Sequence, residues 1–460
     1  MTTAILPLGR PTFDVPFANE KLAAMLARLD ATGRPFTGPR ELLFDADATR
    51  KALAELREQA IEQLLVLQVT FTDASMTVEA ADALGLPMAI WAIPEPRIGG
   101  RLRLNSFCGL NLASHALGLN DRRFSWLYGD PETVADEDIA MLLDGRRLSG
   151  RIDGAPADAD PALGARLRDA VSGRKIGRIG EHPVGFHTCA YSKQKLLALG
   201  GVTVDELELG ELFETARGAD DDSLAAVRKS AMAQLHDLDE VNQDELDRSL
   251  RLKVALEQLR KGGKYDAFAI RCWPETFTEY GGAVCGPVAM MGEARVPCAC
   301  EADVYGAFTQ MLLQEAAAAP VFLTDLVDVD RQDDSAVVWH CGQAPLSMCA
   351  PETAPSATIH TNRKMPLLYQ FPLKAGRITL MRISQAFGEP KMILAGAEML
   401  DREMAFTGTS GVLRFDRPAG EVLDDIIASG LEHHMALAYG EHRPLLRSLA
   451  ASMQLPVLEL

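Results

Sequence analysis

The sequence has little cysteine and lacks long apolar runs. Only 8 of its 460 residues are cysteines, too few for a disulfide-stabilised scaffold, and Cys298 and Cys300 do not have the spacing of a CxxC redox or zinc motif. We therefore expect reduced, mostly buried cysteines without a catalytic role. No run of about 18 apolar residues occurs, and the first residues do not combine a basic segment with an apolar core. The sequence thus predicts neither a membrane span nor a signal peptide, and favours a cytoplasmic location.

Positive charge is also scarce. The chain has 46 Lys and Arg residues against 64 Asp and Glu residues, which gives a net charge of −18. Such a charge repels nucleic-acid phosphates and anionic lipids, so we expect neither nucleic-acid nor membrane partners. The hydrophobic share of 47 % and the charged share of 24 % are ordinary for globular proteins. Because a chain of this length exceeds what one hydrophobic core usually supports, two or three domains are expected.

Strand-like and helix-like segments alternate through most of the chain. Residues 64–74 and 87–93 are continuous apolar runs on either side of a helical pattern, as is typical of parallel strands buried on both faces. A second alternation follows residues 155–169, and after Pro351 the apolar runs become short and are separated by Gly and Pro. The sequence predicts an α/β protein with two doubly wound, Rossmann-like domains, residues 1–172 and 173–350, and a smaller β-rich, barrel-like domain, residues 351–460.

Two acidic residues each close an apolar segment of the predicted central domain. Glu301 ends VPCACE, and Asp325 ends PVFLTD after an amphipathic helical pattern. If the two strands are parallel neighbours, about 4.8 Å apart, both carboxylates face the crevice beyond the strand ends, where open α/β sheets bind ligands. His340 closes a third run, AVVWH. A divalent cation can keep two neighbouring carboxylates ionised, and this ligand set suits Mn²⁺, Mg²⁺ or Co²⁺. The alternative is that Glu301 caps a helix and Asp325 is a solvated loop residue.

The pair His433 and His434 supplies further candidate ligands. Adjacent side chains point in different directions, so at most one is expected to bind an ion while the other packs or hydrogen bonds. The segment that follows, from residue 433 to the C-terminus, has the pattern of a helical stretch ending in an apolar strand.

Three residues are candidates for sugar contact. Arg10, Gln68 and Trp273 offer a guanidinium fork, an amide and an apolar ring, all of which suit a polyol. Each also has a structural alternative: Arg10 pairs with Asp14 on the surface, Gln68 lies within a strand, and Trp273 belongs to the core.

Several of these segments together resemble the L-fucose and L-arabinose isomerases. They are GRPTFD, the Cys272-Trp273 pair, CACEADVYGAFTQMLLQ, VFLTD, WHCG at 339–342, GTSGVLRF and EHHMALAYG. The resemblance implies that Glu301 and Asp325 bind Mn²⁺ and act as acid and base, that His434 completes the metal site, and that His340 matches an additional ligand of the arabinose isomerases. It leaves His433 as a substrate contact. It also implies a homo-oligomer with sites near subunit interfaces.

We therefore predict a metal-dependent aldose-ketose isomerase that acts on an open-chain sugar through an enediol, with two carboxylates as acid and base. Two alternatives stay open. One is a non-catalytic sugar-binding protein, and the other is a metal-dependent lyase or epimerase on the same fold. The chemistry of the products separates these alternatives.

Overall fold

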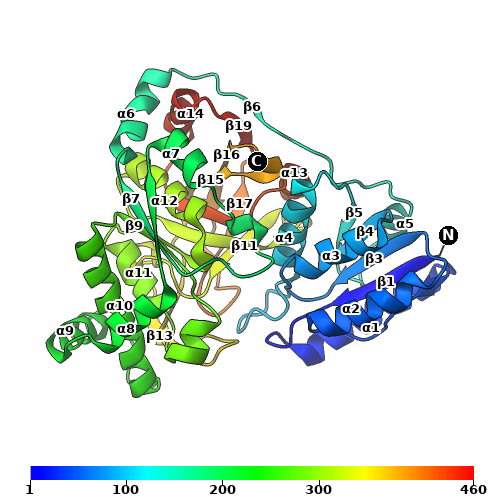
Figure 1. Ribbon diagram of the computed structural model, residues 1–460, viewed down its shortest axis with the longest axis horizontal. Coiled ribbons are helices and arrows are strands. Elements are labelled where there is room, and N and C mark those ends of the chain that lie inside the picture. Colours follow the sequence, from blue (N-terminus) through cyan, green and yellow to red (C-terminus); the bar gives the residue numbers. More distant parts are fainter. Residues whose placement is uncertain (1) are drawn as a thin grey trace.

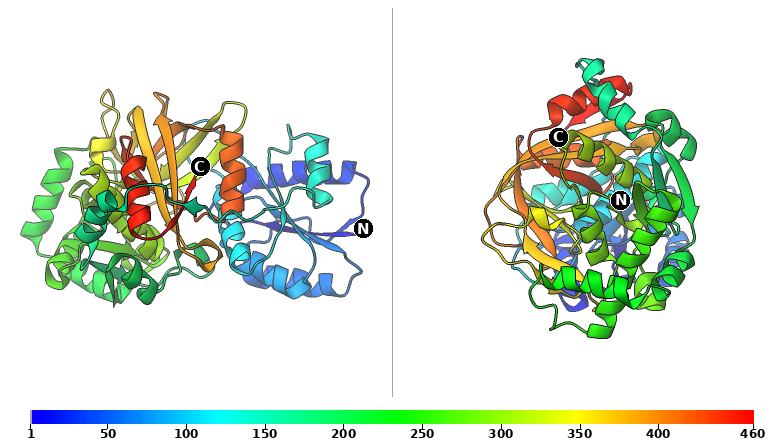
Figure 2. Two further views of the ribbon diagram at one scale, coloured as in Figure 1. Left: turned by 90° about the horizontal axis from the view of Figure 1, so that it is seen from above. Right: turned by 90° about the vertical axis from the view of Figure 1, so that its left-hand side faces the viewer.

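The computed structural model describes residues 2–460 and contains three sheets (Figure 1). A five-stranded parallel sheet is formed by the N-terminal part, a four-stranded parallel sheet by the middle of the chain, and a ten-stranded mixed sheet mainly by the C-terminal part. In the left view of Figure 2, the orange strands of the mixed sheet lie between the blue N-terminal part and the green middle part. In this described range, no helix is both long and apolar enough to cross a membrane.

The first sheet has the strand order β2-β1-β3-β4-β5, and its strands are all parallel, as the apolar runs predict. Side chains of α2, α3 and α4 pack on one face and those of α1 and α5 on the other. The elements are β1 Thr3–Leu8, α1 Val15–Ala31, β2 Phe36–Thr37, α2 Ala46–Arg57, β3 Gln63–Gln68, α3 Ser75–Leu84, β4 Met88–Ala92, α4 Ser106–Leu119, β5 Ser125–Tyr128 and α5 Asp136–Leu143.

The second sheet has the order β10-β9-β7-β8 and is also parallel. Its strand β10 is a short edge strand, after which the chain turns directly into α12. The elements are α6 Pro161–Val171, β7 Lys175–Ile179, α7 Lys193–Gly200, β8 Thr203–Leu207, α8 Leu209–Arg217, α9 Asp221–Met232, α10 Gln243–Gly263, β9 Ala267–Ile270, α11 Cys285–Glu293, β10 Cys298–Ala299 and α12 Val304–Ala317. A π-helical turn lies at Thr276–Tyr280 and a 3-10 turn at Cys300–Ala302.

The third sheet contains a closed ring of antiparallel strands. Strand β17 pairs with both β12 and β16, so the order β17-β12-β11-β18-β15-β16 returns to its start. This closure leaves fewer unpaired strand edges. The elements are β6 Ala155–Pro156, β11 Phe322–Asp330, β12 Ser335–His340, β13 Ser356–Thr358, β14 Leu368–Pro372, β15 Gly376–Ser384, β16 Lys391–Met399, β17 Thr409–Phe415, α13 Ala419–Ser429, β18 His434–Tyr439, α14 Arg443–Ser452 and β19 Pro456–Glu459.

The expected parallel pairing of the strands that precede Glu301 and Asp325 is wrong. Strand β10 pairs with β9 in the second sheet, whereas Asp325 lies within β11, which is antiparallel to β12 and β18 in the ring. The apolar pattern of β11 continues beyond Asp325, and the polar turn after Asp330 folds the chain back into β12 as a hairpin. The two carboxylates therefore come from different sheets. Because β11 and β12 pair with strands beyond residue 351, the ring also extends across that position.

The segment that begins at His434 is a strand rather than a helix. Residues His434–Tyr439 form β18 between β11 and β15, and only then does α14 follow. The run Met-Ala-Leu-Ala favours a helix locally, but pairing on both sides and burial in the ring override that preference.

Candidate active site

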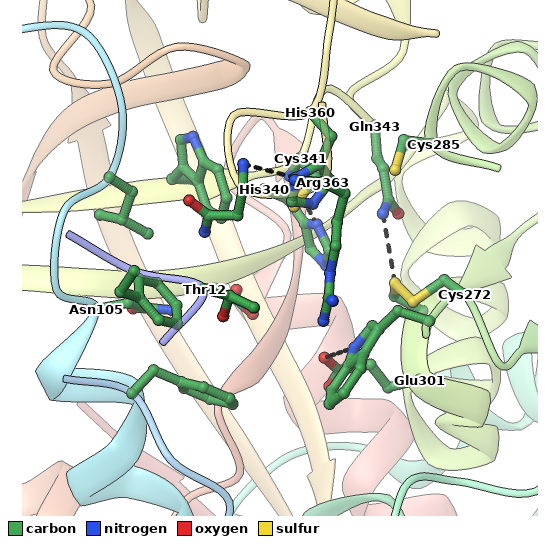
Figure 3. Close-up of a pocket in the computed structure, with 18 of the residues that line it drawn as sticks. Thr12, Asn105, Cys272, Cys285, Glu301, His340, Cys341, Gln343, His360 and Arg363 are labelled. Atoms are coloured by element: carbon green, nitrogen blue, oxygen red, sulfur yellow. Dashed lines mark hydrogen bonds between the residues drawn. A yellow bond between two sulfur atoms is a disulfide. The ribbon is translucent and has the colours of Figure 1, made fainter. Parts of the chain in front are cut away.

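A pocket lies where the three sheets meet, and it encloses about 780 Å³ including the part open to solvent (Figure 3). Its lining comes from segments that are far apart in the sequence. They are Arg10, Thr12, Phe71 and Asn105 from the N-terminal part, Cys272, Trp273 and Glu301 from the second sheet, Asp325, Trp339 and His340 from the ring, and His360, Asn362 and Arg363 from the loop between β13 and β14. The site therefore depends on the whole chain.

Glu301 follows β10 in a backbone conformation that non-glycine residues rarely adopt, with φ at 59°. Such conformations concentrate at functional sites. Its Oε1 accepts a hydrogen bond from Trp273 Nε1 at 3.0 Å, and its Oε2 accepts one from His433 Nε2 at 2.8 Å. Burial raises the pKa of Glu301, but the hydrogen bonds and the neighbouring histidines outweigh this effect and bring the pKa to about 2. Glu301 is therefore a carboxylate at neutral pH.

Asp325 and His434 face each other across the antiparallel pair β11 and β18. The Nε2 atom of His434 lies 3.4 Å from Asp325 Oδ1 and 3.8 Å from Glu301 Oε2. Burial lowers the pKa of His434, but the surrounding carboxylates raise it overall. Three acidic side chains thus make this point of the site favourable for positive charge.

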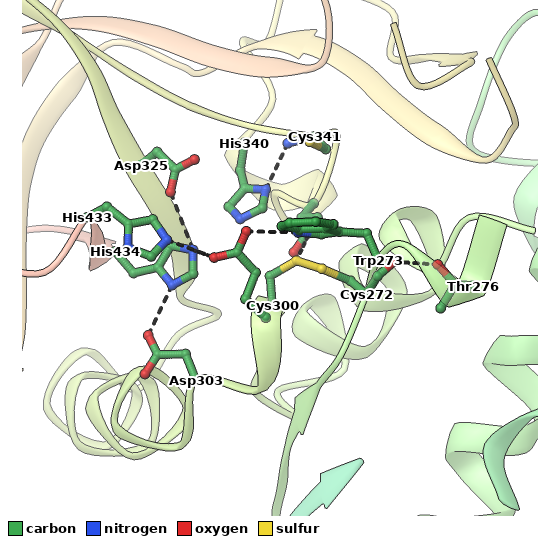
Figure 4. The surroundings of a disulfide bond; sticks show 12 residues. Cys272, Trp273, Thr276, Cys300, Asp303, Asp325, His340, Cys341, His433 and His434 are labelled. Atoms are coloured by element: carbon green, nitrogen blue, oxygen red, sulfur yellow. Dashed lines mark hydrogen bonds and ion pairs between the residues drawn. A yellow bond between two sulfur atoms is a disulfide. The ribbon is translucent and has the colours of Figure 1, made fainter. Parts of the chain in front are cut away.

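Asp303 orients His434 and is a functional residue that the sequence reading missed. Its Oδ2 lies 3.0 Å from His434 Nδ1 (Figure 4), and a carboxylate can only accept there, so His434 carries a proton on Nδ1 and Nε2 is the ring nitrogen left to bind an ion. Arg382 donates two hydrogen bonds to Asp303, at 2.6 and 3.0 Å, and both side chains are buried. Burial raises the pKa of Asp303, but Arg382 and His434 hold it well below its usual range. The signal in the sequence was Arg382, a charge enclosed by apolar neighbours in the run ITLMRIS.

His340 closes β12 and has the opposite tautomer. The backbone N–H of Cys341 donates to its Nδ1 at 2.8 Å. Burial, the largest effect, lowers the pKa of the ring to about 4, so it is neutral and its proton lies on Nε2. This buried Nε2 has no hydrogen-bond partner among residues 2–460. The ring therefore presents an N–H donor toward the pocket rather than a lone pair.

The cluster fits a divalent cation. A potential ligand atom of His434 lies within 4.8 Å of one on Asp325 and of one on Glu301. His340 and Cys189 lie within the same distance, but His340 presents an N–H there and burial raises the pKa of the Cys189 thiol. The buried Oδ1 of Asp325 has no hydrogen-bond partner in the described part of the chain. Carboxylate oxygens with one imidazole nitrogen are ligands that Mn²⁺, Mg²⁺ and Co²⁺ accept. The donor set thus suits the class of ion expected from the sequence, without specifying one.

The structure brings Arg10, Trp273 and His433 to the pocket, but not Gln68. The surface alternative paired Arg10 with Asp14. In the structure, Arg10 pairs with Asp73 instead, and its Nη2 lies 2.6 Å from Asp73 Oδ2. Gln68 is fully buried in β3, where its amide nitrogen donates to the carbonyl of Thr70 and the hydroxyl of Thr72. It does not line the pocket.

A disulfide joins Cys272 and Cys300, which corrects the expectation that all cysteines are reduced (Figure 4). The two residues follow the neighbouring strands β9 and β10, which brings their Cα atoms to 5.8 Å. Their separation of 28 residues carries no recognisable motif. The bond links the residues directly before Trp273 and Glu301, so it holds the hydrogen-bonded pair together.

Comparison with known proteins connects the chain to one group of enzymes. Residues 4–145 match the family model described as the fucose/sulfoquinovose isomerase N-terminal domain. The chain is 29 % identical over 442 residues to a sulfoquinovose isomerase of Priestia aryabhattai, covering 96 % of this chain and 95 % of the relative. It is 28 % identical over 467 residues to a sulfoquinovose isomerase of Alkalicoccus urumqiensis, covering 100 % and 99 %. The similarity therefore includes every segment that lines the pocket.

These similarities define the class of protein: it is an intramolecular oxidoreductase, an aldose-ketose isomerase. Residues 4–145 match the N-terminal domain of the fucose/sulfoquinovose isomerases, and the rest of the chain is similar to sulfoquinovose isomerases, which confirms the resemblance seen in the sequence.

Proposed function

We propose that the protein is a metal-dependent isomerase that converts an aldose to its ketose through an enediol, and that sulfoquinovose is its substrate. The observation that carries the proposal is that Glu301 and Asp325 line one pocket, with His434 Nε2 3.8 Å from Glu301 Oε2 and 3.4 Å from Asp325 Oδ1. The substrate comes from the relatives, which are sulfoquinovose isomerases similar to this chain along almost its entire length.

Glu301, Asp325 and His434 would hold the cation, with Mn²⁺ as the first choice and Mg²⁺ or Co²⁺ as alternatives. When bound, a divalent cation polarises the sugar carbonyl and stabilises negative charge on O1 and O2. We assign His340 a different role from the ligand role that the resemblance implied. Its Nε2–H donates a hydrogen bond to a substrate oxygen, because Cys341 already occupies Nδ1.

The two carboxylates move one proton. In the aldose-to-ketose direction, a carboxylate takes the proton from C2, the enediol forms, and a carboxylate returns a proton to C1, so the reaction needs no external oxidant. The O2 proton moves to O1 in the same cycle. Trp273 and His433 hold Glu301 by one hydrogen bond on each of its oxygens, which fixes the orientation of this carboxylate relative to the sugar.

The proposal includes two expectations from the sequence that concern the whole protein. One is a cytoplasmic location, and the other is a homo-oligomer with sites near subunit interfaces. Arg10 lines the pocket of its own chain, so a neighbouring subunit would complete the entrance rather than supply this residue. Light scattering of the purified protein measures the oligomeric state.

The direct test is product analysis. The purified protein is incubated with Mn²⁺ and sulfoquinovose, and the sugar is analysed by NMR and mass spectrometry. The proposal expects the corresponding ketose, with equal mass. Cleavage fragments would instead indicate a lyase, a second aldose would indicate an epimerase, and binding without turnover would indicate a sugar-binding protein.

A further inference from the structure

One guanidinium in the pocket has no acidic partner. Arg363 lies on the loop between β13 and β14, and Figure 3 shows its side chain reaching into the pocket toward Glu301. It is half-buried, and within residues 2–460 no carboxylate lies within ion-pair distance of it and no side-chain hydrogen bond is formed. A partly buried charge without a partner is costly unless a ligand neutralises it.

A second guanidinium increases the positive charge at this place. The guanidinium carbon of Arg10 lies 5.3 Å from the centre of the Trp273 ring, and that of Arg363 lies 5.6 Å from the same ring. Burial and then the charge of Arg10 lower the pKa of Arg363. Asp73 neutralises Arg10 but not Arg363. An anion between the two guanidiniums would relieve this repulsion.

The loop holds Arg363 in place. The backbone N–H groups of Asn362 and Arg363 both donate to His360 Nδ1 at 3.2 Å. Arg101 donates to the Asn362 side-chain oxygen at 2.7 Å and to the backbone carbonyl of Thr12. The loop is thus tied to the N-terminal part, so the backbone that carries Arg363 is held at the pocket before any ligand arrives, which reduces the entropic cost of binding.

The balance of charge indicates what kind of anion fits. A divalent cation would balance Glu301 and Asp325, and Asp73 balances Arg10, so Arg363 leaves one positive charge. A sulfonate carries one negative charge at neutral pH, whereas a phosphate monoester carries about −1.5 to −2. Trp273 lies next to both groups of charges, which we call the acidic end (Glu301, Asp325) and the cationic end (Arg10, Arg363) of the pocket: its Nε1 donates to Glu301, and its ring contacts both guanidiniums.

We propose that Arg363, with Arg10 beside it, binds the sulfonate of the sugar and makes the site select a monoanionic substrate over neutral and dianionic sugars. This inference rests on the proposed function, because it requires C1 and C2 of the sugar at the carboxylate end. The planar N–H fork of arginine matches two oxygens of such a group. Arg363 is a specificity residue and takes no part in the proton transfer.

The test uses three sugars that share the reacting carbons: sulfoquinovose, its neutral counterpart 6-deoxyglucose, and glucose 6-phosphate. We expect Arg363→Gln to lower kcat/KM for sulfoquinovose about 10- to 100-fold, mainly through KM, while the value for 6-deoxyglucose changes less than about twofold. Arg363→Lys should recover part of the loss. The control is Lys364→Gln, which removes the same charge from the same loop at an exposed position outside the pocket, and it should leave all three values unchanged.

Equal losses for the charged and neutral sugars in Arg363→Gln, or no loss for either, would overturn the inference while the isomerase activity stands. Failure of the wild-type protein to convert any of these sugars would instead contradict the proposed function. Calorimetry of sulfoquinovose and 6-deoxyglucose binding still decides the role of Arg363 in that case.

A salt series on the wild-type protein tests the same inference without a variant. High salt should weaken only the binding of the sulfonated sugar. Equal salt dependence for both sugars would also overturn the inference.

Discussion

The two ends of the pocket are built in different ways. At the acidic end, Asp325 and His434 lie on paired strands, and buried Asp303 and Arg382 support them. At the cationic end, Arg363 lies on a loop, is half-buried and has no ion-pair partner in the described chain. Strands fix positions precisely and loops vary more easily. The residues proposed for the chemistry are therefore held by strand pairing and buried partners. Arg363, proposed for substrate choice, can be changed without disturbing them.

The largest effect is expected at the buried support of the acidic end. Asp303→Asn leaves the buried Arg382 guanidinium without its main partner, so the free energy of unfolding should fall by about 3–5 kcal/mol in urea denaturation. Metal affinity should fall about 10- to 100-fold, because His434 loses its orienting carboxylate.

The matched control is Asp136→Asn, which breaks an ion pair between Arg28 and an almost fully exposed Asp136. It should cost less than about 1 kcal/mol. If Asp303→Asn and Asp136→Asn lowered the free energy of unfolding equally, the buried support of the acidic end would be no stronger than a surface ion pair.

The next largest effect concerns the carboxylate chemistry. Glu301→Gln should lower kcat for sulfoquinovose about 100-fold or more, because the amide cannot accept the proton and is a weaker ligand. The control is Glu398→Gln, an exposed residue on β16, whose kinetics should match those of the wild-type protein. Turnover of Glu301→Gln within about twofold of wild type, with metal still bound, would refute the acid-base assignment.

The free energy of unfolding should depend on pH through Glu95, a buried carboxyl group that holds residues 103–105 beside the pocket. Glu95 accepts backbone N–H groups of Arg103, Leu104 and the pocket residue Asn105. Burial, opposed by these bonds and assisted by Asp328, raises its pKa from 4.5 to about 7. The folded state then retains the proton longer than the unfolded chain. The free energy of unfolding should therefore fall by about 1–3 kcal/mol as the pH rises from about 4.5 to about 7.

Glu95→Gln isolates this contribution. Urea denaturation across the same pH range should show a smaller slope in the variant than in the wild-type protein. Parallel curves would mean that Glu95 ionises normally in the folded state.

The smallest expected effect tests the different roles of His340, as a hydrogen-bond donor, and His434, as a metal ligand. His340→Ala removes a hydrogen-bond donor, so kcat/KM should fall about tenfold while the metal content per chain, measured by mass spectrometry, stays unchanged. His434→Ala should lose the metal. If His340→Ala lost it as well, the ligand role implied by the arabinose isomerases would be correct.

The sequence predicts the residues of the acidic end better than their arrangement. Glu301, Asp325 and His434 each follow or begin an apolar run, and the family resemblance joins them. The pairing of the strands could not be predicted from the sequence, because the apolar run of β11 fits a parallel α/β strand and a ring strand equally well. The polar turn at 331–334 was the only local sign of a hairpin.

The cationic end could not be predicted for a different reason. Arg363 lies in a loop whose sequence, HTNRKM, has no periodic pattern and resembles an ordinary surface turn. Its importance depends on contacts with Trp273 and on the absence of an acidic neighbour in the described chain, and both are properties of the tertiary fold. The Cys272–Cys300 bond was missed likewise, since only strand pairing brings the two residues together.

The most direct test of the central claim is deuterium incorporation from heavy water. The protein is stripped of metal with a chelator, divided, and assayed with sulfoquinovose with and without added Mn²⁺. We expect a ketose carrying solvent deuterium at C1 only in the sample with metal, because a carboxylate at the acidic end exchanges its proton with water during the transfer. Equal conversion without metal, or product without deuterium even after long incubation, would contradict an acidic end that uses a cation and a carboxylate to move the proton.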